Sequence, residues 1–212
     1  MTGFKVKMIF ETIIITVNAA QEPHITPFGV LFEGEQVIIS PYKPSTTLNN
    51  ILATQFAVMN MTDDVRVFAG ALTGNTNWSL LPIKDHAGIY SAYRLADCLA
   101  HTVLQLIEVR DDETRPQLVM QAICSKNHQS FQGFNRAQAA VVELSILVSR
   151  LHILPKEKVM TEKAYLQIAI DKTAGERELE AWAWLVDKIN NFYAEPIDTN
   201  LAGTNQHDAA VN

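Results

Sequence analysis

The sequence has few cysteines, no paired histidine spacing and no long apolar run. Its two cysteines, Cys98 and Cys124, form neither a C-x-x-C pair nor a zinc-type spacing, which argues against a redox motif and a structural zinc site. Without a recognisable export signal a disulfide is disfavoured, so both are interpreted as small buried apolar side chains. The six histidines show no H-x-x-x-H or similar spacing, and no metal site is predicted.

Positive charge is also scarce. The net charge is −6, and phosphate neutralisation needs a basic face, so we expect no nucleic-acid binding. The apolar segment at residues 8–17 is interrupted by Glu11 and threonines, and a bilayer-spanning helix needs about 20 residues. We therefore interpret this segment as a strand, and we expect a cytoplasmic protein that makes no contact with a membrane.

What the sequence does contain is a β-rich first part. Residues 11–42 hold three apolar, β-branched runs, and the short break at residues 33–35 suits a tight hairpin. Pro27 and Gly29 lie inside the second run; proline suits an edge strand or a bulge, and glycine lets a ligand or another backbone come close. Further on, residues 88–110 and 116–126 resemble two long strands, which fit a barrel better than a flat sheet.

Helical patterns dominate after about residue 130. Asn135 and Gln138 resemble a capping box, and apolar residues then recur at helical spacing: Ala137, Val141, Leu144, Val148 and Leu151. A last long helix is expected after a second capping box, with one apolar face that contains Leu179, Trp182, Val186 and Ile189. The segment between them, residues 161–170, is ambiguous, and we expect a short helix there.

These patterns predict an α+β protein with three parts. Residues 1–130 are expected to form a mainly antiparallel, barrel-like domain, and residues 131–194 a helical subdomain. The polar, aperiodic residues 195–212 are expected to form a flexible tail.

Two polar stretches suggest helix starts or binding sites. Lys43, Ser45, Thr46 and Thr47 precede a short helix; the hydroxyls suit a helix cap, while the same groups with free helix N–H groups would also make a phosphate site. Thr62 resembles a second N-cap, with the next two aspartates either in the first helical turn or available to a cationic substrate.

The order of these parts resembles the FMN-binding split-barrel proteins, the flavin reductase-like superfamily. The similarity is greater to one branch, the family named domain of unknown function 447. Five strings carry it in order: ETIIITVN, PFGVLF, NMTDDV, GFNRAQAAVVE and KTAGERELEAW. The resemblance spans about residues 8–192 and implies a split β-barrel with an appended C-terminal helical subdomain.

The resemblance also implies a cofactor, FMN, and its binding residues. The phosphate is expected at Lys43, Ser45, Thr46 and Thr47, with Asn50 near phosphate or ribityl or bonded within its own helix. The isoalloxazine ring is expected along a kinked strand and its neighbour, beside His24, Thr26, Pro27, Phe28, Gly29, Asn60, Met61 and Thr62. Many split barrels add an arginine at the phosphate, and Arg94 or Arg110 are the candidates here.

The function implied is an FMN-dependent oxidoreductase of an unknown small metabolite, with a link to one-carbon or tetrahydromethanopterin metabolism. Split barrels of this type are homodimers, so a homodimer is expected. Whether the chain is an enzyme stays open. The alternatives are a non-catalytic flavin-binding or partner-docking module, and a split barrel that uses heme or a deazaflavin.

Overall fold

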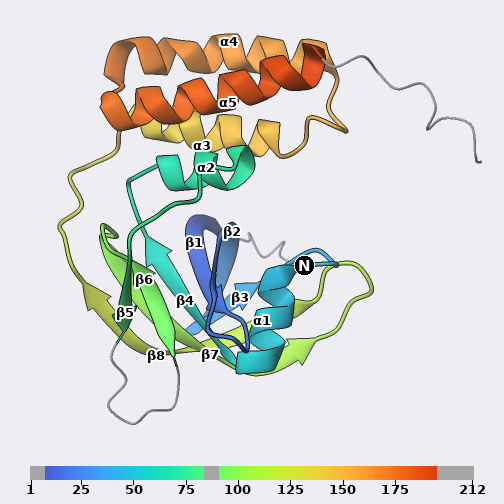
Figure 1. The fold of residues 1–212 in the computed structure, drawn as a ribbon, viewed down its shortest axis with the longest axis vertical. Coiled ribbons are helices and arrows are strands. Elements are labelled where there is room, and N and C mark those ends of the chain that lie inside the picture. Colours follow the sequence, from blue (N-terminus) through green and yellow to red (C-terminus); the bar gives the residue numbers. More distant parts are fainter. Residues whose placement is uncertain (1–7, 84–90, 195–212) are drawn as a thin grey trace, which may run out of the picture.

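The computed structural model describes residues 8–83 and 91–194, and in this part the chain forms a barrel under a helical layer (Figure 1). The predicted tail at residues 195–212 lies outside the described residues. Six antiparallel strands close in the order β1-β2-β3-β8-β7-β4. Their bounds are Ile9–Val17, Pro23–Glu33, Gln36–Ile39, Phe56–Met61, Ala100–Arg110 and Gln117–Asn127 for β1, β2, β3, β4, β7 and β8. The predicted α+β class is confirmed.

The barrel buries apolar side chains on both faces of its strands. Its interior is filled by residues of every strand, among them Ile14, Val30 and Leu104, together with Leu48 and Ile51 from helix α1 (Thr46–Thr54). The outer face of β1, β4 and β7 is covered by helix α2 (Arg66–Thr73) and by a hairpin of β5 (Leu80–Ile83) and β6 (Ala92–Leu95). Helix α1 therefore packs into one end of the barrel, and α2 lies over its side.

Strand β2 is only partly paired. Its residues 23–31 pair with β1, but only residues 31–33 pair with β3. On the other side of residues 23–30 the described chain provides no neighbouring strand, so alternate backbone N–H and C=O groups point away from the barrel. We name this stretch the β2 edge. Pro27 lies in it, as its missing N–H predicts.

The helical layer is joined to the barrel through α2. Val67 and Phe68 pack on the barrel side, whereas Val65 and Ala69 join the core of the C-terminal helices. These helices are α3 (Arg136–Val148), α4 (Lys156–Thr173) and α5 (Glu176–Ala194), which stack above α2 in Figure 1. The five apolar positions predicted for α3 are all buried in this core.

Several local predictions were wrong. Helix α4 is one long helix and not a short one, although only Val159 and Ile170 are buried in it. The predicted strand at residues 88–110 is interrupted between β6 and β7, and its first three residues lie outside the described part. Leu179 is 52% exposed, since the buried face of α5 runs instead through Ala181, Trp182, Leu185 and Ile189.

The predicted N-cap at Thr62 is also replaced. Helix α2 begins at Arg66 and has no side-chain cap. The Thr62 hydroxyl accepts a hydrogen bond from the Asp64 N–H at 3.1 Å, and the Asp64 carboxylate accepts one from the Arg66 N–H at 3.2 Å. Asp64, and not Thr62, therefore accepts a hydrogen bond from the first backbone N–H of α2. Its carboxylate is held in this position by a charged partner.

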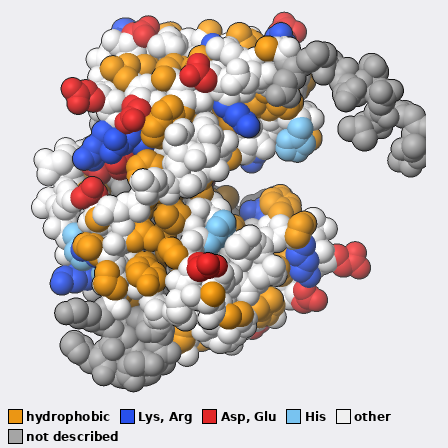
Figure 2. Space-filling view, viewed as in Figure 1, with side chains coloured by type: hydrophobic (Ala, Val, Ile, Leu, Met, Phe, Trp, Pro, Cys, Tyr) orange, Lys and Arg blue, Asp and Glu red, His pale blue; other side chains and the backbone are white. Residues whose placement is uncertain are grey.

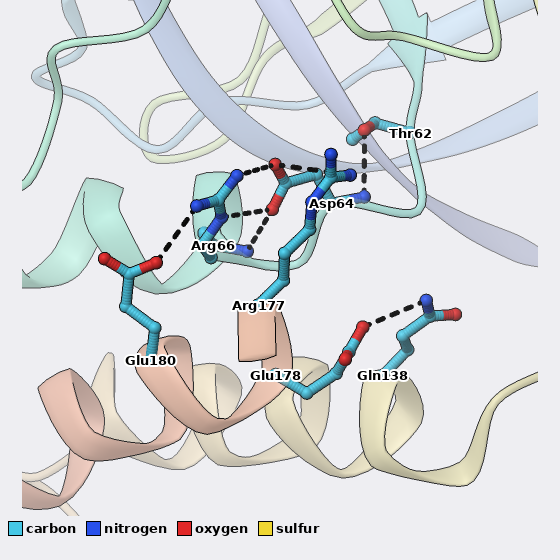
Figure 3. Close-up of polar contacts among 7 residues, drawn as sticks. All are labelled: Thr62, Asp64, Arg66, Gln138, Arg177, Glu178 and Glu180. Atoms are coloured by element: carbon cyan, nitrogen blue, oxygen red, sulfur yellow. Dashed lines mark hydrogen bonds and ion pairs between the residues drawn. The ribbon is translucent and has the colours of Figure 1, made fainter. Parts of the chain in front are cut away.

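That partner is the Arg66 guanidinium, which ties the barrel to α5 (Figure 3). Its Nε donates to Asp64 Oδ1 at 2.9 Å and a terminal nitrogen to Asp64 Oδ2 at 2.7 Å, a bidentate pair with Asp64 only 5% exposed. The other terminal nitrogen donates to Glu180 of α5 at 3.0 Å. The hydrogen bonds with Asp64 raise the pKa of Arg66, so its positive charge is permanent.

Replacing Asp64 by asparagine should loosen this attachment. Asp64→Asn keeps the shape but removes the charge that Arg66 pairs with, so we expect the free energy of unfolding to fall by about 1–3 kcal/mol. Urea unfolding measures this. The adjacent Asp63 is less buried and makes no recorded hydrogen bond in the described residues, so Asp63→Asn is the matched control, with a change within about 0.5 kcal/mol. Equal effects of the two variants would contradict this role for Asp64.

Candidate functional site

The start of α1 presents hydrogen-bond donors. Ser45 is the N-cap, and its hydroxyl accepts from the Leu48 N–H at 3.2 Å. The first-turn N–H groups of Thr46 and Thr47 have no acceptor recorded in the described residues, as is usual at a helix N-terminus. Thr46 is exposed and Thr47 is buried. The structure is therefore compatible with a helix cap and with a phosphate site. Ser45 caps the helix, and the N–H donors beside it are free to face an anion.

Lys43 lies next to these donors but is held by the turn between β7 and β8. Its backbone N–H donates to Thr114 O at 2.8 Å, and its ammonium contacts the Asp111 carboxylate at 3.0 Å and Asp112 O at 2.8 Å. The ammonium lowers the pKa of Asp111. Exposed ion pairs of this kind contribute little to stability, so an incoming anion can compete for the lysine.

A second cation in this region is Arg115, which the sequence did not suggest. Its guanidinium lies 4.7 Å from the centre of the Tyr42 ring, and its Nε donates to Ser40 O at 3.0 Å. The two arginines that the sequence did suggest are engaged elsewhere. Arg94 donates to Leu95 O and Ala96 O, and Arg110 pairs with Glu33 and Glu108.

The β2 edge adjoins α1 through a row of polar side chains. Asn50 of α1 donates to the Thr16 hydroxyl of β1 at 3.0 Å, and Thr16 pairs with His24 of β2. His24 Nε2 lies 2.6 Å from the Thr26 hydroxyl, and burial lowers the pKa of this histidine. Asn50, one of the residues expected near the phosphate, is thus linked to the first residues of the strand expected to hold the ring.

Backbone access along the β2 edge depends on small side chains. A Cβ on Gly29 would lie 2.7 Å from Ile9 Cγ2 and 3.1 Å from Glu11 Oε1, so glycine allows both side chains to pack directly on β2. Phe28 points to the other face and joins the barrel interior. Of the predicted ring residues on β2, Thr26 and Pro27 line a surface cavity, and Gly29 lies beneath the Ile9 and Glu11 side chains.

The remaining three predicted residues lie on or just after β4, on the other side of β1 from β2, where Ile13 pairs with both Pro27 and Asn60. Asn60 is completely buried, where its side chain donates to Ile13 O and Val58 O and accepts from the Leu95 N–H at 2.9 Å. Met61 ends β4 and packs against the barrel interior, and Thr62 belongs to the turn that starts α2. In this chain Asn60 acts as a structural link between β4, β1 and β6.

A histidine pair that the spacing did not reveal lies between β7 and the end of β8. His101 Nδ1 and His128 Nε2 are 2.8 Å apart, and the two rings stack with centres 5.0 Å apart. His101 is 4% exposed, and its Nε2 has no hydrogen-bond partner in the described residues. The described ranges contain no group of three or more His, Cys, Asp or Glu side chains that is arranged for a metal ion.

Only one of the two cysteines is buried as predicted. Cys98 is buried, 3.8 Å from the Arg94 guanidinium, and burial raises the pKa of its thiol. Cys124 is exposed, so the prediction that both are buried was wrong. Cys124 lies beside a bulge of β8, where the register shifts and the strand turns its side chain to solvent.

Acid should destabilise the fold through His101. Burial, aided by the charges of His128 and Arg94, lowers the pKa of His101 from 6.5 to about 4. Its contribution to stability is therefore complete above pH 6.5 and is lost as pH falls towards 4, because the unfolded chain binds the proton first.

In urea unfolding at a series of pH values through this window, His101→Gln should flatten the decline, by up to about 1.4 kcal/mol per pH unit. The exposed His152 supplies the control, since His152→Gln should leave the slope unchanged. An unchanged slope in His101→Gln would show that this histidine is not the group responsible.

The chain matches two family models and resembles several solved structures. The model described as the N-terminal domain of the protein of unknown function DUF447 matches residues 10–129, and the model described as protein of unknown function DUF447 matches residues 135–187. A search of curated proteins found no match. None of the helices in the described ranges combines the length and the apolar character needed to cross a bilayer.

Among solved structures, the FMN-bound DUF447 protein from Methanosarcina mazei has a TM-score of 0.73 at 18% identity, over 86% of this chain and 96% of that chain. The 2-nitrobenzoate 2-nitroreductase NbaA of Pseudomonas fluorescens gives 0.48 at 15% identity, over 56% and 64% of the two chains. Flavoredoxin of Methanosarcina acetivorans gives 0.45 at 11%, over 62% and 75%. The first likeness confirms the split-barrel fold. Since the two family models cover most of the described residues, the chain belongs to the DUF447 family.

Proposed function

We propose that this protein binds FMN between the start of α1 and the β2 edge, and that it is a flavin-dependent oxidoreductase acting on a small metabolite. The observation that carries the proposal is family membership together with the fold of an FMN-bound member. The link to one-carbon or tetrahydromethanopterin metabolism has no support in the described residues and stays a prediction.

The donor set at α1 fits a phosphate. A helix N-terminus carries free N–H groups and about half a positive charge, and both favour an anion. Here the Thr46 hydroxyl is exposed beside them, and Lys43 and Arg115 lie on the two adjoining loops. Lys43 would exchange the Asp111 carboxylate for the phosphate, whereas Ser45 would remain the helix cap.

The β2 edge fits the flat, polar rim of a flavin ring. Its outward-pointing backbone N–H and C=O groups have no strand partner in the described residues, and such groups are a common means of orienting a flavin. Pro27 has no N–H to offer a further strand, and Gly29 adds no side chain of its own to that edge. When bound, FMN would supply hydride chemistry, while the protein would hold the ring, limit water and determine which molecule reaches it.

A homodimer remains part of the proposal. The barrel exposes several large apolar side chains on β1, β2, β7 and β8, namely Ile9, Phe10, Phe32, Ile107, Val109 and Ile123. Large apolar side chains exposed together on one part of a protein are typical of interfaces, and two of these, Phe10 and Phe32, are in contact. A second copy covering the barrel would bury these side chains.

The partner-docking alternative has less support. It would gain from an exposed apolar face on residues 137–151, but the apolar positions of α3 are buried against α2, α4 and α5. No feature of the described residues favours heme or a deazaflavin over FMN as the cofactor. The flavin proposal is therefore the one that we take to experiment.

Removing two donors at α1 should weaken FMN binding. In Lys43→Ala/Thr46→Ala the phosphate loses an ammonium and a hydroxyl, and each charged contact contributes roughly 1.5–3 kcal/mol, so we expect affinity to fall tens-fold or more. Titration of FMN fluorescence quenching against the purified apoprotein gives the dissociation constant directly.

The control removes the same residue types from α4. Thr161→Ala/Lys163→Ala lies on the surface of the helical layer and should bind FMN like the unmodified protein. If the α1 variant also binds normally, the hydroxyl run is a helix cap and nothing more. If the unmodified protein binds no FMN, the proposed function fails.

A further inference from the structure

A groove separates the barrel from the helical layer beside the β2 edge. Figure 2 shows the molecule hollowed between these two parts. The cavity measures about 260 Å³ and is open on one side. Its floor consists of Glu11, Thr26 and Pro27 of β1 and β2, and its walls come from α2 and α3. The volume is slightly below that of pockets for drug-sized ligands, so it suits a small molecule.

The walls of the groove are apolar and close together. Phe68, Ala71 and Leu72 of α2 face Val142 and Ile146 of α3 across it. Apolar walls of this kind favour a flat ring system, because its faces leave water when it enters. Ala71 leaves space on the α2 wall where any longer side chain would fill the groove.

The polar groups on the α3 wall have already used their hydrogens. The Ser145 hydroxyl donates to Val141 O at 2.8 Å, and the Ser149 hydroxyl donates to Ile146 O at 2.8 Å. A hydroxyl that has donated its single hydrogen retains only acceptor capacity. The Thr26 hydroxyl is bonded to His24. Both serines therefore offer acceptors to a ligand in the groove, not donors.

The strongest acceptor in the groove is the Glu11 carboxylate. Its side chain is exposed, lies against the bare backbone of Gly29 and makes no hydrogen bond or ion pair within the described residues. Partial burial and Glu143 raise the pKa of Glu11, while Arg150 lowers it. A carboxylate at the mouth of an apolar groove that makes no hydrogen bond can accept one from a charged N–H donor, which is stronger than a bond from a neutral donor.

We infer that this groove is the binding site for the second substrate, a small flat molecule whose apolar ring carries N–H donors, such as an amidinium or an amino-substituted heterocycle, and that Glu11 holds those donors. This assignment rests on the proposed function, because Thr26 and Pro27 line the groove and belong to the strand proposed to hold the flavin ring. It adds a chemical class that the flavin site itself does not specify: the lining of the groove offers acceptors, so ligands with N–H donors are favoured over anions.

Benzamidine is a suitable probe, with benzamide and benzoate as matched ring compounds. Isothermal titration of the full chain, with and without FMN, should give binding in the order benzamidine, benzamide, benzoate. Glu11→Gln should weaken benzamidine roughly ten- to hundred-fold, because a charge-assisted hydrogen bond is lost. Ala71→Leu should abolish binding of all three by filling the groove, while the exposed Glu35→Gln should change nothing.

Two results would overturn the inference: unchanged benzamidine affinity in Glu11→Gln, or tighter binding of benzoate than of benzamidine by the unmodified protein. Flavin fluorescence quenching in the same samples separates this inference from the proposed function. Normal FMN binding without Glu11-dependent benzamidine binding overturns only the groove assignment. Glu11-dependent benzamidine binding without FMN binding supports the groove and overturns only the flavin proposal.

Discussion

The arrangement of the whole molecule depends on α2 being buried on two sides. One side packs on the barrel through Val67 and Phe68, and the other enters the helical core through Val65 and Ala69. A Cβ on Gly70 would come within 2.9 Å of the Trp78 ring, so even the backbone of α2 is closely covered. Such a helix cannot shift without opening two cores, and Arg66 adds a charged tie to α5. The width of the groove between barrel and helices is set by this helix.

The candidate site, in contrast to the tightly packed α2, depends on a strand that is incompletely paired. Strand β3 is short, so it covers only the end of β2 and leaves residues 23–30 open. An open edge is a hazard for aggregation unless it is blocked or used. Proline at position 27 limits strand addition, and α1 lies beside the first residues of the edge through the Asn50–Thr16 contact. The open edge is thus protected from other strands but remains accessible to a small molecule.

The sequence predicted those parts of the fold whose cause is local. The helical period of α3 and the β-branched runs of β1 to β3 depend on neighbours in the chain, and both were recognised. Helix α4 buries only two residues, so it has little period to detect. Arg115 approaches Ser40 because Ile39 pairs with Leu118, and His101 meets His128 because β7 pairs with β8. Contacts between residues so distant in sequence leave no spacing signal, and neither was predicted.

The two sides of β2 have complementary chemistry. Near α1 the chain offers N–H groups, a hydroxyl, Lys43 and Arg115, which favour an anion. In the groove it offers Glu11 and two hydroxyls that can only accept, which favour a donor. Thr26 and Pro27 line the groove and belong to the strand proposed to hold the flavin ring, so the two proposed ligands would share one short backbone segment. If both proposed sites are occupied, charge would distinguish the two ligands before their shapes matter, so neither would compete for the site of the other.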